Sequence, residues 1–305
     1  MTVLPEKDRV RVSGGELACV DLGEPENPAV VLLHGFPTSA FLWREFVPLL
    51  SQWFRVIAPD LLGYGDSDKP TRGELHIRAQ AGCVRELLAH LGIERFAVAG
   101  HGAGGGVAQL LALGVGVEAM ILIDSVAFDG WPDEATRELR SLPPEQERED
   151  LALALITRAF DLGMGHRDRL SDEDLAEFRR PWEGEEGMRA YFRAARAIDG
   201  AGLAGTEEQL AALECPVLIL WGEDDPFFPV EVAERLNDAM PTSALALLPG
   251  CSHFVTEDAA ESVAPLLYEY LRVKYLKRGH DHAHEGPIPV VLGRRPTPEE
   301  EGLDQ

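Results

Sequence analysis

The sequence is short of cysteine, of basic residues and of long apolar runs. Its four cysteines, Cys19, Cys83, Cys215 and Cys251, show no Cys-x-x-Cys spacing, which argues against a zinc site or a disulfide framework and predicts reduced thiols. No apolar run approaches the ~18 residues that are needed to span a bilayer. Residues 1–9 carry charges where a signal peptide needs an apolar segment, so we expect a soluble, cytoplasmic protein.

The deficit of basic residues makes the chain strongly acidic. It has 28 Lys and Arg residues against 52 Asp and Glu residues, a formal net charge of -24. Such a field repels phosphate backbones and anionic lipid, so neither nucleic acid nor a membrane is expected as a partner. The acidity is expected to maintain solubility. A small molecule is the expected ligand or substrate.

Short β-branched runs alternate with amphipathic helical stretches along most of the chain. This alternation predicts the α/β class, with a mainly parallel, doubly wound sheet covered by helices on both faces. The predicted strands are 10–21 as an antiparallel pair, 29–33, 55–58, 96–99, 120–123, 217–220 and 244–248; the predicted helices are 80–91, 104–113, 230–239 and 259–271. Nearly all of the last six strands are continuously apolar, which is typical of parallel strands buried on both faces.

The pattern changes between the strands predicted at 120–123 and 217–220. From Trp131 to about Gly205, Glu/Arg-rich helical segments at 147–160, 172–180 and 187–198 replace the strand-like runs. An all-helical insertion here would cover the carboxyl edge of the sheet as a cap. We therefore predict a core at 1–130 and 205–276, a helical cap at 131–204, and a flexible polar tail at 277–305.

Five motifs follow predicted strands. They are HGFP at 34–37, DLLGYGDSD at 60–68, VAGHGAGG at 98–105, WGEDDPFFP at 221–229 and PGCSHF at 249–254. The third combines a strand-to-helix turn with small residues, which allow a helix to approach neighbouring strands closely. The last two carry Asp225 and His253.

In this order the motifs resemble the α/β-hydrolase fold family, over roughly residues 9–128 and 205–275, in the branch of epoxide hydrolases, dehalogenases and esterases. The resemblance implies an α/β-hydrolase fold in which the backbone N–H groups of Phe36 and Ala103 form an oxyanion hole. It also places Gly102 at the nucleophile position of the elbow, where the family has Ser, Asp or Cys. Glycine has no side chain and cannot attack a substrate.

The resemblance further assigns the acid to Asp225 and the base to His253, because such a pair orients the imidazole and stabilises its protonated form. Asp224 is the neighbouring alternative for the acid. Some relatives carry the acid where this chain has Asp124, for which we expect a structural role. Ser125 beside it is a less favoured candidate for a displaced nucleophile.

Trp131, Trp182, Tyr191 and Phe192 are the candidates for lining a substrate cavity from the cap, although helical aromatics more often form the core of a cap. Epoxide hydrolases generally present two cap tyrosines, and this segment offers Tyr191 alone. Haloalkane dehalogenases usually have Trp after the nucleophile, where this chain has Ala103. An ester, a lactone or a similar carbonyl compound needs only a base and an oxyanion hole, and is therefore the expected substrate.

Several functions are compatible with a glycine at the elbow. The dyad could support hydrolysis without a covalent intermediate, or cofactor-free lyase chemistry. Alternatively, the chain could be a small-molecule binding protein, or an Asp- or Ser-nucleophile hydrolase inactivated by substitution at Gly102. No cofactor and no metal site are expected, and the sequence leaves the oligomeric state open.

Overall fold

The computed structural model describes residues 4–114, 116–129, 134–198 and 202–276. Within these residues, eight strands form one sheet in the order β1-β2-β4-β3-β5-β6-β7-β8. They are β1 (Asp8–Val12), β2 (Gly15–Leu22), β3 (Ala29–Leu33), β4 (Arg55–Pro59), β5 (Phe96–His101), β6 (Val117–Ile123), β7 (Val217–Gly222) and β8 (Ser243–Leu248). β2 is antiparallel to both β1 and β4, and the other neighbours are parallel. The predicted mainly parallel sheet with an antiparallel amino-terminal edge is confirmed.

The parallel strands form where the sequence has continuous apolar runs. β3, β5 and β7 are buried at every residue. A strand covered on both faces needs apolar residues at successive positions rather than at alternate ones. β8 forms the edge of the sheet and is only partly buried.

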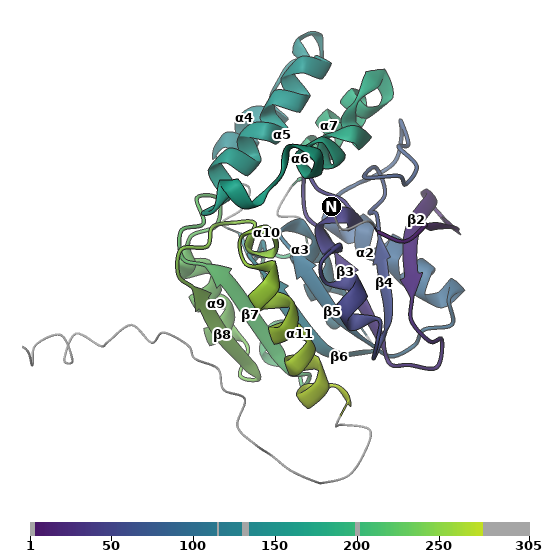
Figure 1. Cartoon of the computed structure of the whole chain (residues 1–305), viewed down its shortest axis with the longest axis vertical. Helices are drawn as coiled ribbons and strands as arrows, with labels where there is room; N and C mark the ends of the chain where they lie inside the picture. The colour runs from purple at the N-terminus through teal and green to yellow at the C-terminus, as the bar shows by residue number, and fades with distance from the viewer. Residues whose placement is uncertain (1–3, 115, 130–133, 199–201, 277–305) are drawn as a thin grey trace, which may run out of the picture.

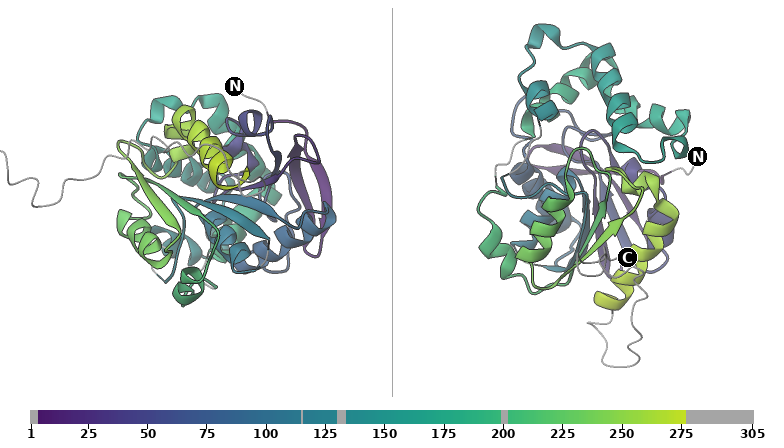
Figure 2. Two further views of the ribbon diagram at one scale, coloured as in Figure 1. Left: turned by 90° about the horizontal axis from the view of Figure 1, so that it is seen from below. Right: turned by 90° about the vertical axis from the view of Figure 1, so that its left-hand side faces the viewer.

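Helices cover both faces of the sheet (Figures 1 and 2). α1 (Val47–Leu50) and α11 (Ala260–Lys274) pack together on one face, and α2 (Ile77–His90), α3 (Ala103–Ala112) and α9 (Val230–Ala239) cover the other. The four helices predicted for the core are confirmed. The short helices α1, α8 (Glu207–Ala211) and α10 (Val255–Asp258) were not predicted, because about one helical turn is too short to show a hydrophobic period.

Four further helices lie between β6 and β7 in the sequence and gather over the carboxyl ends of the strands, at the top of Figure 1. They are α4 (Glu134–Arg140), α5 (Glu149–Gly163), α6 (Asp172–Arg179) and α7 (Gly184–Ala197). The predicted helical insertion is confirmed, with α4 as an addition to the three helices expected. Trp131 and the tail at 277–305 lie outside the described residues, and the exact domain limits stay predictions.

The order of the strands indicates where a ligand would bind beneath this cap. After β3 the chain passes to β4 on one side, and β5 then returns to the other side of β3. At such a switch point the loops that follow neighbouring strands diverge, and ligands of open α/β sheets bind there. The loops after β3 and β5 carry Phe36 and Gly102.

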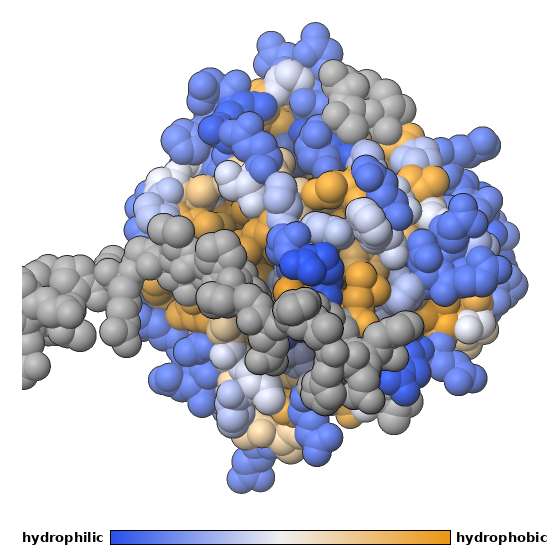
Figure 3. Space-filling view, turned by 60° about the horizontal axis from the view of Figure 1, so that its bottom comes forward, coloured by the Kyte–Doolittle hydropathy of each residue, from blue (hydrophilic) through white to orange (hydrophobic). Residues whose placement is uncertain are grey.

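The end of the molecule away from the cap is shown in Figure 3, where hydrophilic side chains form most of the outline and apolar patches lie between them. Among the described residues, no helix has both the length and the apolar character that crossing a membrane requires. The four cysteines are buried and form no disulfide.

Candidate active site

Gly102 forms the turn between β5 and α3, with φ 53° and ψ -120°. Residues with a side chain rarely adopt this conformation. Gly104, one position inside the helix, packs so closely on β3 that a side chain there would collide with the carbonyl oxygens of Leu33 and His34. The small residues of the 98–105 motif therefore allow the helix to approach the sheet.

The space above Gly102 is open enough for a side chain. A Cβ atom built on this residue would lie 3.6 Å from the Cα of Gly35 and 3.8 Å from Nε2 of His253. These are ordinary van der Waals distances. The position that a nucleophile would occupy therefore faces the imidazole directly.

The structure brings His253 and Asp225 together. Nδ1 of His253 lies 2.9 Å from Oδ2 of Asp225, and both side chains are almost fully buried. The other carboxylate oxygen, Oδ1, accepts hydrogen bonds from the backbone N–H groups of Phe227 and Phe228, at 2.8 and 3.0 Å. Because the carboxylate accepts the Nδ1 proton, the basic lone pair of the neutral imidazole is at Nε2, which faces Gly102.

Aromatic rings surround the imidazole of His253. Phe227, Phe228 and Phe254 present their edges or faces at centroid distances of 5.1, 5.1 and 5.0 Å. Sequence reasoning missed this role, although all three phenylalanines lie in the motifs that carry the acid and the base. Apolar rings therefore flank the imidazole on several sides.

A second histidine, His101, supports the loop of the first. Its ring is fully buried, and Nε2–H donates to the backbone carbonyl of His253 at 3.0 Å. Burial, with a smaller contribution from His253, lowers the pKa of His101 well below its ordinary value. His101 therefore stays neutral and fixes the backbone of the catalytic-base candidate.

The loop after β3 presents the N–H of Phe36, and the first turn of α3 presents the N–H of Ala103. Neither N–H has a hydrogen-bond partner among the described residues, as expected for the first residues of a helix in the case of Ala103. His34 shapes the loop: its Nδ1–H donates to the carbonyl of Gly35, and its Nε2 accepts from the N–H of Leu61, both at 2.9 Å. Burial lowers the pKa of His34 to about 4, so the ring stays neutral.

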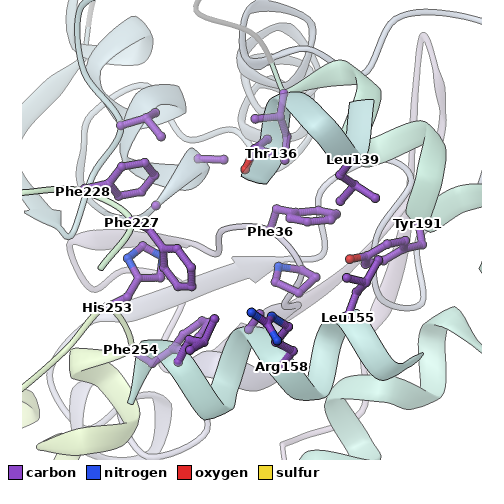
Figure 4. A pocket seen from close by; sticks show the side chains of 17 residues that line it. Phe36, Thr136, Leu139, Leu155, Arg158, Tyr191, Phe227, Phe228, His253 and Phe254 are labelled. Carbon is purple, nitrogen blue, oxygen red and sulfur yellow. The ribbon is translucent and has the colours of Figure 1, made fainter. Parts of the chain in front are cut away.

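A cavity of about 170 Å³ lies between the cap and these groups (Figure 4). Most of its lining is apolar, and the described residues that line it are Phe36, Pro37, Gly102, Ala103, Val126, Thr136, Leu139, Leu155, Arg158, Ala159, Leu162, Tyr191, Ile198, Phe227, Phe228, His253 and Phe254. Tyr191 packs beside Phe36, with a centroid distance of 5.1 Å. Of the four cap aromatics considered for the lining, Tyr191 lines the cavity, Phe192 is buried outside the described lining, and Trp131 lies outside the described residues.

Trp182 does not belong to the described lining, contrary to our expectation. Its side chain is completely buried, and its indole N–H donates to the carbonyl of Pro37 at 2.9 Å. The ring also meets Tyr64 and Tyr191 edge-on. A buried indole needs a partner for its N–H, and here this partner joins the cap to the loop of Phe36.

Asp124 makes no hydrogen bond to His253, whose partner is Asp225. Its Oδ1 accepts the backbone N–H of Gly222 at 2.8 Å, and the side chain is fully buried. Burial, with a smaller contribution from Asp225, raises the pKa of Asp124 well above its ordinary value. These contacts support the structural role expected for Asp124. Ser125 is also engaged, since its hydroxyl donates to the carbonyl of Val126.

Asp258, whose role was not predicted from the sequence, joins the cap to the loop of His253. Its buried carboxylate accepts the backbone N–H groups of Gly165 and His166, just beyond α5, at 2.9 and 2.8 Å. It also accepts the N–H of Ser252, at 2.8 Å. The loop that carries the imidazole is therefore tied to the end of a cap helix.

The described residues contain no group of three or more His, Cys, Asp or Glu side chains placed to hold a metal ion.

Comparisons with known proteins agree with this architecture. The family model described as alpha/beta hydrolase fold matches residues 28–260. Haloalkane dehalogenase 2 of Mycobacterium bovis is 29% identical over 270 residues, which cover 84% of this chain and 92% of that protein. A soluble epoxide hydrolase of a Corynebacterium species is 31% identical over 255 residues, which cover 77% and 86%. The crystal structure of an alpha/beta hydrolase fold protein from Burkholderia ambifaria superposes with a TM-score of 0.78 at 29% identity, covering 87% of this chain and 98% of that one. The chain therefore belongs to the alpha/beta hydrolase fold family.

Proposed function

We propose that the protein hydrolyses small, largely apolar esters or lactones, with a water molecule attacking in place of a covalent nucleophile. One observation carries the proposal. A Cβ atom built on Gly102 would lie 3.8 Å from Nε2 of His253, and Nδ1 of this imidazole is hydrogen-bonded to Asp225. A water molecule beside Gly102 can place its oxygen where the hydroxyl oxygen of a serine side chain would lie. The base and its orienting carboxylate therefore suit activation of a water molecule at this position.

The reaction proceeds in two proton-transfer steps. Nε2 of His253 accepts a proton from the water molecule while the water oxygen bonds to the carbonyl carbon, and Asp225 stabilises the imidazolium that forms. The N–H groups of Phe36 and Ala103 donate to the developing oxyanion. Collapse of the tetrahedral intermediate breaks the bond to the alcohol, which takes the proton from His253, and the carboxylic acid is released.

Carbonyl chemistry suits this cavity better than the reactions named for two relatives, a haloalkane dehalogenase and an epoxide hydrolase. Opening an epoxide calls for acidic groups at the leaving oxygen, and Tyr191 is the one tyrosine in the described lining. Holding a leaving halide calls for N–H donors such as indoles, and the described lining has no tryptophan. General-base assistance alone contributes about 10²–10⁴-fold, so we expect modest turnover.

A panel of neutral esters, lactones, epoxides and haloalkanes tests the proposal on the chain as it stands. We expect turnover of at least one reactive ester or lactone, and its loss in His253→Ala because the base is gone. His90→Ala, which removes an exposed histidine at the end of α2, is the matched control and should leave the rate unchanged. Turnover that persists in His253→Ala would contradict the mechanism. An inert chain that is stabilised against heat by a small apolar ligand would show a binding protein instead.

A further inference from the structure

The cap helix α5 contributes a continuous face to the cavity. Leu155, Arg158, Ala159 and Leu162 all line it, and their spacing of three, one and three residues places them on one side of the helix. Leu162 is half exposed, and Arg158 is exposed as well, so this part of the face forms the mouth of the cavity. An arginine therefore occupies one position of an otherwise apolar stripe.

Arg158 has no ion pair and no hydrogen bond among the described residues, although acidic residues outnumber basic ones almost two to one. Many other arginines of the chain have acidic partners, such as Arg44 with Glu257 and Arg167 with Asp161, whereas exposed ones such as Arg11 have none among the described residues. Asp161, one turn along α5 from Arg158, is thus already paired with Arg167. Figure 4 shows Arg158 among the cavity-lining side chains, together with Leu155 and Tyr191. It is the single charged side chain of the described lining apart from the titratable His253.

We propose that Arg158 binds a carboxylate on the substrate, so that the preferred substrates are apolar esters or lactones that carry a second, free carboxylate. This inference rests on the proposed function. A guanidinium matches a carboxylate with two parallel hydrogen bonds, and the apolar walls beside it strengthen the attraction relative to open water. The apolar lining accommodates the chain that joins the carboxylate to the ester.

A carboxylate suits this site better than a phosphate does. A phosphate monoester carries close to two negative charges at neutral pH, and the described lining offers one guanidinium to balance them. The net charge of -24 opposes the approach of any anion, and it opposes a doubly charged one more strongly. The structure therefore favours a singly charged group.

The test compares the monomethyl esters of glutaric and adipic acids with their neutral analogues, in which a primary amide replaces the free carboxylate. At one fixed ionic strength, we expect kcat/KM to be about tenfold higher for the acids. Arg158→Gln should remove this preference by raising KM for the acids, with kcat nearly unchanged, because the contact is remote from the reacting carbonyl. Arg158→Lys should keep part of the preference for the acids. Arg137→Gln, an equal loss of charge on an exposed cap residue outside the described lining, should leave both substrates unaffected.

The outcomes separate this inference from the proposed function. If the neutral analogues are hydrolysed as well as the acids and Arg158→Gln changes neither, the inference is wrong while the function stands. A preference for a phosphate-bearing ester would overturn it too. If no compound is hydrolysed, the proposed hydrolase function is wrong, and ligand binding then tests the role of Arg158. Glutaric monoamide should stabilise the wild type against heat more than glutaric diamide does, and Arg158→Gln should abolish the difference; equal effects of the two compounds would refute it.

Discussion

Replacing Gly102 by serine should change stability and chemistry in opposite directions. The added Cβ meets no atom closer than 3.6 Å, so the cost is conformational rather than steric. A non-glycine residue at φ 53° and ψ -120° costs about 1–3 kcal/mol, and we expect Tm to fall by several degrees. The serine Oγ lies one bond beyond a Cβ that is 3.8 Å from Nε2 of His253, which brings it within hydrogen-bond reach and supplies a nucleophile.

Thermal unfolding together with pre-steady-state hydrolysis of 4-nitrophenyl butyrate tests both effects. Gly102→Ser should release a burst of 4-nitrophenol and accumulate an acyl-enzyme that mass spectrometry detects, because an acyl intermediate now forms. Gly102→Ala is the matched control: it carries the same Cβ, should lose the same stability, and should give no burst. A folded serine variant without a burst would refute the placement of Gly102 at the reacting position. A serine variant as stable as the wild type would refute the strain argument.

Three further predictions concern the groups around this position. Asp225→Asn should lower kcat by about 10²–10⁴-fold, because an amide facing Nδ1 favours the tautomer in which His253 is no longer basic at Nε2; steady-state kinetics measure this, and an unchanged kcat would contradict it. Burial lowers the pKa of His34 from 6.5 to about 4, so below pH 6.5 the unfolded chain binds a proton that the folded chain does not. The stability of the wild type relative to His34→Gln should therefore fall by about 3 kcal/mol between pH 6.5 and about 4 in urea unfolding, and a pH-independent difference would refute the shift. Asp258→Ala leaves three backbone N–H groups without their carboxylate and should lower the free energy of unfolding by about 2 kcal/mol. This figure is below the full cost of three lost hydrogen bonds, because two of the N–H groups can bind water instead. A loss below 0.5 kcal/mol would contradict the role of Asp258 in joining the cap to the loop of His253.

The dyad and the elbow were accessible from the sequence because each is carried by a short local motif. Asp225 and His253 directly follow strands, and neighbouring parallel strands end at one edge of a sheet, so residues 28 apart in the chain come within 2.9 Å. The glycines around Gly102 likewise predicted the strand-to-helix turn, since only small residues permit the close approach of α3 to β3.

The sequence by itself determined the α/β class, the positions of the strands and the helical nature of the insertion. Continuous apolar runs define strands covered on both faces, and Glu/Arg-rich amphipathic segments define helices, without reference to the rest of the chain. Only the tertiary structure decided which side chains the cap presents to the cavity. Helical periodicity marks the apolar face of a cap helix but not the surface on which that face packs. The sequence therefore could not distinguish Trp182, which donates a hydrogen bond to the carbonyl of Pro37, from Tyr191, which lines the cavity. For the same reason it could not show that Arg158 opens onto the mouth of that cavity.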